Sequence, residues 1–419
     1  MDDVVHERCA GIDISKGDVK VCVRLPGAGR RRKSEVRTFS TMTRDLLVMR
    51  DWLLAERVTV VGMEATGSYW KPVFYLLEHD LECWLLNARH MKSVPGRKTD
   101  VLDSEWICRL VEHGLVRPSF VPPEPIRQLR DLTRYRTEIV RERTREAQRL
   151  EKLLEDAGVK LSLVVSDLLG VSARAMLEAL IAGERDGQVL AELALGSMRR
   201  KRTILADALS GNFNEHHAFI ARTMLDRIDA CRATEARLDA QIDEQVRPFR
   251  RQLDLIETVP GASRRTAQVI LAEIGADPAR FPSAAALASW AGMCPGNNQS
   301  GATARNGPTR HGDPWLKAAL GQVAVSAGRT KGTYLAARYR RIAARRGKKR
   351  ALVAVGHSVL ISVWHMLTTD LPYQDLGPDH FINRLDDRGK ARTARRLVDQ
   401  LGQLGYHVTL QPAPVPAPG

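Results

Sequence analysis

The sequence predicts an α/β domain with a mixed sheet at the N-terminus, a helical coiled-coil middle and a mostly helical C-terminal region. Before Pro118, short β-branched segments alternate with helical segments in the order βββαβαβα. Residues 126–157 contain neither glycine nor proline and are rich in charged residues, which is typical of a long helix. The proline-rich segment Pro118–Pro125 separates the two patterns and indicates a domain boundary.

The composition indicates a globular chain with a polyanionic partner. Of 419 residues, 44% are hydrophobic and 27% are charged, which excludes an intrinsically disordered protein. A chain of this length holds about two to four domains. The 64 lysines and arginines exceed the 49 aspartates and glutamates by 15. We therefore expect nucleic acid as the partner, ahead of an acidic membrane surface.

The cysteine pattern and the first residues indicate a reduced, intracellular protein. The six cysteines are scattered and none forms a C-x-x-C pair, which argues against a disulfide framework or a cysteine-rich zinc site. Residues 1–7 carry acids where a signal peptide needs a basic start. The apolar segment Ala351–Leu367 contains two histidines, and we expect a buried helix there rather than a membrane span.

Each element of the first region follows from its apolar pattern. Three strands come first, with a basic turn at residues 27–33 between the second and the third, and helix–strand units follow. A meander of three strands followed by such units describes a mixed sheet. The predicted strands are residues 9–14, 19–25, 36–40, 58–63 and 83–86, and the predicted helices are residues 46–54, 69–77 and 101–111.

Beyond the boundary, the pattern is helical. The charged segments 126–157 and 219–246 are expected to pair as antiparallel helices, with short glycine-separated helices between them. A third region contains helical runs and a glycine-rich loop, and the end of the chain, Pro412–Gly419, is expected to be disordered. The predicted domains are residues 1–120, 121–250 and 251–375, followed by an extension at residues 376–419.

Four acidic residues of the first region form a candidate metal site. Asp13 lies in the middle of the first strand, where a carboxylate is costly to bury unless it is paired or metal-bound. Glu64 ends the fourth strand, and Asp100 and Asp103 share one face of the last helix. Carboxylate oxygens favour Mg²⁺ or Mn²⁺, and two such ions catalyse phosphodiester chemistry. The alternative for Asp100 is a simple helix cap. The four acids follow the order expected for a ribonuclease-H-like sheet.

The third region contains a glycine-rich segment with a candidate nucleophile. Residues 258–262 and the helix after them resemble the hairpin of helix-hairpin-helix DNA binders, with an ordinary helical turn as the alternative. Ser300 precedes Gly301 and can expose its hydroxyl group, although a plain turn residue fits as well. Arg305, Arg310 and the adjacent His311 are suited to neutralise a phosphate.

A basic segment from Arg329 to Arg350 contains no acidic residue and predicts a nucleic-acid contact, with a solvated face as the alternative. Tyr334 and Tyr339 lie within it and are suited to stacking on bases or sugars. The candidate contact residues in this segment are Arg338, Arg340, Arg341, Arg345, Arg346, Lys348 and Lys349. The arginine-rich helix at 127–152 also carries acids, and helix–helix pairing is the better interpretation there.

Taken together, these segments resemble the DEDD-type insertion-sequence transposases, the recombinases guided by a bridge RNA. The resemblance covers residues 9 to 370 except for the middle, about 155 to 250, which matches only as a helical spacer. The matching motifs are GIDISK at 11–16, MEATGSYW at 63–70, KTDVLDSEWICRL at 98–110, TVPGASRRTAQVILAEIG at 258–275, FPSAAALASWAGMCPGNNQSG at 281–301 and GDPWLK at 312–317.

The resemblance implies a RuvC-like first domain with Asp13, Glu64, Asp100 and Asp103 as ligands of Mg²⁺ or Mn²⁺. It implies a transposase domain in which Ser300 becomes covalently joined to DNA. It further implies a homotetramer assembled through the coiled coil, composite sites between protomers, and a structured bridge RNA that pairs with donor and target DNA. A prokaryotic, cytoplasmic and nucleoid-associated protein follows from it. The sequence departs from the family pattern around the serine, at Cys294 and at residues 297–299.

Two other functions are consistent with the residues themselves. A metal-dependent nuclease that resembles Holliday-junction resolvases would need the acids but not Ser300. A structural nucleic-acid-binding protein would need the basic surface and neither site.

Overall fold

The computed structural model describes residues 4–27, 31–65, 67–87, 91, 103–300 and 303–411. The chain forms two compact units, residues 1–121 and residues 122–419.

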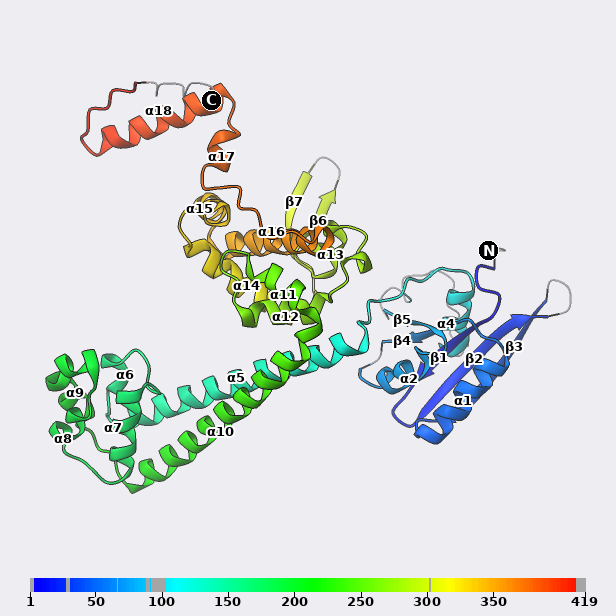
Figure 1. Cartoon of the computed structure of the whole chain (residues 1–419), viewed down its shortest axis with the longest axis horizontal. Helices are drawn as coiled ribbons and strands as arrows, with labels where there is room; N and C mark the ends of the chain where they lie inside the picture. The colour runs from blue at the N-terminus through cyan, green and yellow to red at the C-terminus, as the bar shows by residue number, and fades with distance from the viewer. Residues whose placement is uncertain are drawn as a thin grey trace. The chain divides into compact units, whose positions relative to one another are not determined.

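The first unit contains a five-stranded mixed sheet in the order β3-β2-β1-β4-β5 (Figure 1). Three strands form an antiparallel meander, and the other two are parallel to β1. This arrangement is the mixed sheet that the sequence predicts. The strands are β1 (Cys9–Ile14), β2 (Asp18–Pro26), β3 (Arg32–Ser40), β4 (Val60–Glu64) and β5 (Glu82–Leu86).

The alternation of side chains along β1 assigns its two faces. Ala10, Ile12 and Ile14 belong to a core with helices α1 (Thr43–Ala55) and α2 (Trp70–Leu77). Cys9 belongs to a second core, with residues of α4 (Asp103–Glu112). Because successive side chains of a strand point to opposite faces, Gly11 and Asp13 share the face of Cys9.

Two glycines allow α4 to lie directly on this face of the sheet. A Cβ atom at Gly11 would lie 2.2 Å from the backbone nitrogen of Cys108, and one at Gly62 would lie 2.4 Å from a methyl group of Val111. Any larger residue at Gly11 would therefore have to displace the helix backbone.

The second unit begins with two long antiparallel helices, α5 (Glu124–Asp156) and α10 (Glu215–Gln245). Their antiparallel direction follows from the ion pairs Arg136–Asp239 and Arg143–Glu235, in which the residue number rises on α5 and falls on α10. Figure 1 shows the two helices side by side over most of their length, in agreement with the predicted pairing.

Short helices connect the far ends of α5 and α10 and have a hydrophobic core of their own. That core contains Leu177, Leu190 and Leu205 from the short helices, together with Leu150 of α5 and Leu225 of α10. The connecting helices are α6 (Leu161–Val164), α7 (Val171–Ile181), α8 (Gly187–Glu192), the 3₁₀ helix η1 (Gly196–Lys201) and α9 (Arg202–Leu209).

The rest of the second unit is organised around helix α16 (Lys348–Thr369), whose buried side chains include Val355, Val359 and Val363. Among the described residues, α16 is the one helix that is long and apolar enough to cross a membrane by length and composition; it packs against α11, α13, α14 and α15. The other helices are η2 (Arg247–Phe249), α11 (Arg250–Glu257), α12 (Arg264–Ile274), η3 (Pro278–Arg280), α13 (Ala284–Trp290), α14 (Pro314–Arg329), α15 (Tyr334–Arg346), α17 (His380–Asn383) and α18 (Asp387–Gln403).

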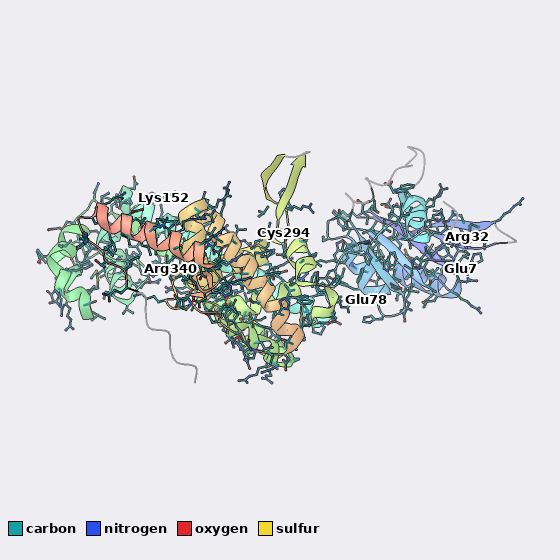
Figure 2. The ribbon with its side chains drawn as sticks, turned by 90° about the horizontal axis from the view of Figure 1, so that it is seen from above. Glu7, Arg32, Glu78, Lys152, Cys294 and Arg340 are labelled. Atoms are coloured by element: carbon teal, nitrogen blue, oxygen red, sulfur yellow. The ribbon has the colours of Figure 1, made fainter. Side chains whose placement is uncertain are left out.

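The segment that the sequence predicts as a glycine-rich surface loop contains a two-stranded β-hairpin. Strand β6 (Pro295–Ser300) pairs antiparallel with β7 (Thr303–Thr309). Glycine, proline and asparagine have low intrinsic strand propensity, and the cross-strand hydrogen bonds outweigh it here. Cys294 precedes β6 at the base of this hairpin (Figure 2).

Candidate functional site

Asp13 and Glu64 lie next to each other on the sheet face that α4 covers. Ile12 of β1 pairs with Met63 of β4 in parallel register, so Asp13 and Glu64 are the next residues of two adjacent strands. Glu64 shares the face of Gly62, against which Val111 of α4 packs. The carboxyl ends of β1 and β4 therefore present two carboxylates toward the same helix.

Helix α4 adds a third carboxylate, because it begins at Asp103. The contact of Gly11 with Ser104 and Cys108 holds the first turns of α4 against β1, and Asp13 follows Gly11 on the same face. Burial, and after it the negative charge of Asp103, raise the pKa of Asp13 above its ordinary value. Asp13 and Asp103 are thus close enough to repel each other.

The fourth predicted acid, Asp100, lies outside the described residues, as do Arg97 and Lys98. Within the described part of the chain, no group of three or more histidine, cysteine, aspartate or glutamate side chains has an arrangement that would hold a metal ion. The structure therefore places Asp13, Glu64 and Asp103 on one face and leaves the complete set of four as a prediction.

The predicted nucleophile lies at the end of the hairpin strand β6. Ser300 is the last residue of β6 and pairs with Thr303 of β7, and Arg305 of β7 pairs with Asn298. The side chains of Ser300 and Arg305 lie outside the described part of the structure. Arg310 follows β7 and is exposed, and its carbonyl oxygen accepts a hydrogen bond from Lys317 Nζ at 2.6 Å.

A groove lies between this hairpin, α15 and α16, with a volume of about 700 Å³, and we call it the hairpin groove. Gly307 and Thr309 of β7 form one wall. Its cationic side chains are Arg338, Arg346, Lys349 and Arg350, and no acidic side chain is among its lining residues in the described structure. A groove of this charge is suited to phosphate groups.

The structure divides the predicted basic residues into two groups. Arg338 and Arg346 of α15 and Lys349 of α16 line the hairpin groove, whereas Arg340, Arg345 and Lys348 do not. Arg341 also lies elsewhere: its guanidinium group is 4.8 Å from the ring centre of Phe381. The basic segment therefore contributes some of its side chains to the hairpin groove, while the others lie outside it.

The two tyrosines of the basic segment make contacts within the protein, and their stacking on bases or sugars stays a prediction. Tyr334 stacks on Phe381 with ring centres 5.3 Å apart. The ring of Tyr339 covers Gly328 of α14, where an added Cβ would lie 3.0 Å from it. Both rings are held by intramolecular packing.

The predicted DNA-binding turn at residues 258–262 packs tightly inside the second unit. Gly261 has a φ of +88°, and a Cβ there would lie 2.4 Å from the backbone nitrogen of Ala327 in α14. The glycine is thus required for the close approach of the turn between α11 and α12 to helix α14, which favours the alternative of an ordinary helical turn.

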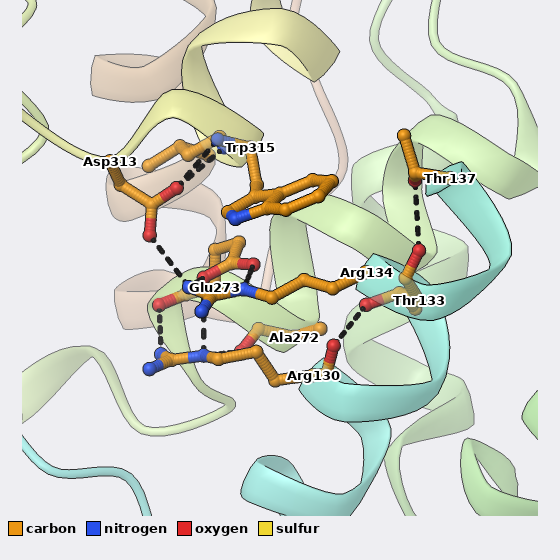
Figure 3. Close-up of polar contacts among 9 residues, drawn as sticks. Arg130, Thr133, Arg134, Thr137, Ala272, Glu273, Asp313 and Trp315 are labelled. Carbon is orange, nitrogen blue, oxygen red and sulfur yellow. Dashed lines mark hydrogen bonds and ion pairs between the residues drawn. The ribbon is translucent and has the colours of Figure 1, made fainter. Parts of the chain in front are cut away.

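The sequence reasoning missed a buried ion-pair network that joins three helices (Figure 3). Glu273 of α12 is fully buried and accepts two hydrogen bonds from Arg134 of α5, each 2.8 Å long. Arg134 also contacts Asp313, which caps α14 through the backbone nitrogens of Trp315 and Leu316. The sequence Asp313-Pro314 is a typical helix start and was the one available signal.

Two separate parts of the chain match family models of transposases. Residues 10–158 match the family model of IS110-type DEDD transposases, described as "Transposase". Residues 253–340 match the model described as "Transposase IS116/IS110/IS902 family". The chain belongs to the IS110 family of transposases. The predicted resemblance is confirmed at the level of the family.

A curated relative supports the same assignment for this insertion-sequence transposase. Over 278 residues the chain is 26% identical to a probable family 20 transposase of Pseudomonas aeruginosa, and the match covers 65% of this chain and 72% of the relative. The first family match contains Asp13, Glu64 and Asp103, and the second contains the hairpin with Ser300. Residues 159–252, which include α6 to α9, lie between the two matches of this IS110-family transposase.

Proposed function

We propose that this transposase is an RNA-guided DNA recombinase that exchanges donor and target strands through a covalent intermediate on Ser300. The observation that carries the proposal is the presence of two sites in one chain: three carboxylates at the ends of β1, β4 and α4, and a serine hairpin beside a cationic groove. A structured bridge RNA is proposed from the family resemblance, with the basic surface as its binding region.

The proposed covalent step uses Ser300 as a nucleophile. Its hydroxyl oxygen forms a bond to the phosphorus of a DNA phosphodiester, and the bond from phosphorus to the leaving sugar oxygen breaks. The serine proton passes to solvent or to a nearby base, and the leaving oxygen takes up a proton. Attack by a sugar hydroxyl of the other DNA strand reverses these changes and completes the exchange.

The proposed metal ligands are Asp13, Glu64, Asp100 and Asp103, with Mg²⁺ or Mn²⁺ as the ion. Hard carboxylate oxygens fit these cations, and a cation would offset the repulsion by Asp103 that helps to raise the pKa of Asp13. When bound, the ion supplies Lewis-acid stabilisation of charge on a phosphate. The acids and the serine belong to different units of the chain, which is compatible with composite sites in a homotetramer.

The decisive experiment combines the full chain with donor DNA, target DNA, the element's RNA and Mg²⁺. We expect Ser300→Ala to lower strand exchange by more than about a thousandfold and to abolish a protein–DNA adduct that survives denaturation. Thr303→Ala is the matched control, because Thr303 is the hairpin partner of Ser300 and should retain exchange. Undiminished exchange by Ser300→Ala would instead support a resolvase-like nuclease, and exchange without RNA would remove the guide from the proposal.

The metal assignment is tested separately by titrating Mn²⁺ into the full chain. We expect Asp13→Asn to weaken Mn²⁺ binding about tenfold or more. Asp51→Asn is the control, since Asp51 is exposed on α1 and pairs with the adjacent Arg50. Equal affinities in the two variants would contradict the assignment.

A further inference from the structure

The hairpin groove has an apolar floor that a phosphate-binding surface does not need. Met293, Ile342, Val353 and Ala354 line it alongside the cationic side chains. Val353 is a large apolar residue of α16 that is 38% exposed, whereas Ala351, Val355 and Val359 of the same helix are buried. An exposed apolar surface enclosed by cations indicates a ligand with one apolar and one anionic part.

The apolar floor is formed where α15 and α16 pack against each other. Met293 is 6% exposed, and its terminal methyl group lies 3.0 Å from where a Cβ of Gly356 would be. On α15, Arg338, Ile342 and Arg346 are spaced by four residues each, so they share one face of the helix. The apolar floor therefore has a charged residue on either side along the same helix.

The cations of the groove are available to a ligand. None of its arginine and lysine side chains forms an ion pair with an acidic residue of the described structure. The Nε of Arg338 is buried without a hydrogen-bond partner among the described residues, while its Nη1 donates to the Tyr334 hydroxyl group at 3.3 Å. His357 also lines the groove and is half-buried, and burial, followed by the charge of Arg338, lowers its pKa.

We propose that the hairpin groove binds a single unstacked nucleotide, with its base on the apolar floor and its phosphates on the surrounding cations. The proposal rests on the proposed function, which brings a nucleic-acid strand to this unit. Bases within a duplex are stacked and paired, so only an everted or single-stranded nucleotide can place its base on such a floor. A volume of about 700 Å³ lies within the usual range for small-molecule sites.

This nucleotide site is separate from the proposed nucleophile. Gly307 and Thr309 contribute to the groove, whereas Ser300 pairs with Thr303 at the other end of the hairpin. At about 3.3 Å per strand residue, the groove lies roughly 13–20 Å from that end along β7. The groove would thus hold a nucleotide several positions away from the scissile phosphate and so help to position the strand.

The test measures binding of the full chain in EDTA to a short oligoadenylate and to a strand of equal length with abasic sugars. The wild-type protein should bind the intact strand at least about tenfold more tightly than the abasic strand, since a base–protein contact contributes about 1–3 kcal/mol. Val353→Gln should reduce this ratio several-fold. Val325→Gln is the matched control, because Val325 of α14 is also 38% exposed and does not line the groove; it should keep the ratio.

Three further measurements make the outcome decisive. Arg346→Ala should weaken both strands equally and leave their ratio unchanged, because it removes a phosphate contact only. An intact duplex should be bound equally by Val353→Gln and Val325→Gln. The experiment is done with DNA strands and with RNA strands. The polymer whose ratio of intact to abasic affinity falls in Val353→Gln is the one that supplies the nucleotide.

The proposal is overturned if wild type does not distinguish intact from abasic strands in either polymer, or if Val353→Gln keeps the wild-type ratio. The assay involves no strand cleavage. Its result is therefore independent of whether Ser300→Ala abolishes exchange, and failure of one proposal can be told from failure of the other.

Discussion

Arg134 and Glu273 form a two-point ion pair in which each guanidinium–carboxylate hydrogen bond is 2.8 Å long (Figure 3). Glu273 is fully buried, and its carboxylate also faces Arg130, with an N–O distance of 3.1 Å. Arg130 additionally donates to the carbonyl oxygens of Ala272 and Glu273 near the end of α12. The pair therefore connects the long helix α5 to α12 and, through Asp313, to the start of α14.

Loss of Arg134 should destabilise the second unit. We expect Arg134→Met to lower the free energy of unfolding by about 2–3 kcal/mol, because the substitution leaves the buried Glu273 carboxylate with one partner fewer. The loss should be smaller than for a fully buried ion pair, because Arg134 is partly exposed. Chemical denaturation of the full chain measures it. Arg141→Met is the control, since Arg141 also lies over the ring of Trp315 but pairs only with Glu138 on the helix surface. A loss of equal size in both variants would assign the effect to Trp315 stacking.

Burial of Glu273 should also make stability depend on pH. Burial raises the pKa of Glu273 from 4.5 to about 7, against the lowering effects of Arg134 and Arg130. The folded state then keeps a proton that the unfolded state releases, so stability should fall as pH rises from about 4.5 to about 7. The decline is at most about 3 kcal/mol. Glu273→Gln should remove it, whereas Glu257→Gln, a partly exposed glutamate paired with Arg264, should keep it. Identical pH profiles for the two variants would rule this origin out.

Gly11 should be irreplaceable by alanine. The added Cβ would lie 2.2 Å from the nitrogen of Cys108 and 2.3 Å from the oxygen of Ser104, so α4 would have to move away from β1. We expect Gly11→Ala to cost about 2–4 kcal/mol in thermal or chemical unfolding, and to weaken Mn²⁺ binding because Asp103 moves with α4. Gly17→Ala, with no atom within 4 Å of its Cβ, should be close to neutral. A stable Gly11→Ala variant with wild-type metal binding would contradict the packing argument.

Two consecutive arginines of α15 should differ in DNA binding. Arg346 lines the hairpin groove and Arg345 does not. Arg346→Ala should weaken duplex binding about fivefold or more at low salt and reduce the slope of log K against log salt by about 0.9, as expected for one lost phosphate contact. Arg345→Ala should change affinity by less than about twofold. Equal effects would mean that the basic segment acts through overall charge alone.

Much of the first unit was predictable because its signals are local. The apolar run at residues 9–14 coincides with β1, and the order of strands and helices matches the predicted one. The long charged segments also became the paired helices α5 and α10. In these elements the spacing of the apolar residues already specifies strand or helix, and the tertiary contacts of the folded chain are consistent with that local preference.

Two features could not be predicted because they depend on contacts between distant segments. They are the hairpin β6–β7 and the division of the basic residues between the groove and the remaining surface. The segment Pro295–Ser300 is rich in turn-forming residues, and it is extended because it pairs with β7. Whether Arg345 or Arg346 faces the groove depends on how α15 packs against α16, and a run of like charges contains no signal for that.

The kinds of residue that carry the chemistry are already visible in the amino-acid order: carboxylates at strand and helix ends, a serine in a glycine-rich segment and a surplus of positive charge. Which of them lie together depends on the folded chain. It set Asp13, Glu64 and Asp103 on one face, because Gly11 and Gly62 let α4 lie on the sheet. It also joined an apolar floor to part of the basic run, because the packing of α15 against α16 places Val353 and Arg346 in the lining of one groove. Such convergence depends on contacts between segments distant in sequence, which local patterns do not encode.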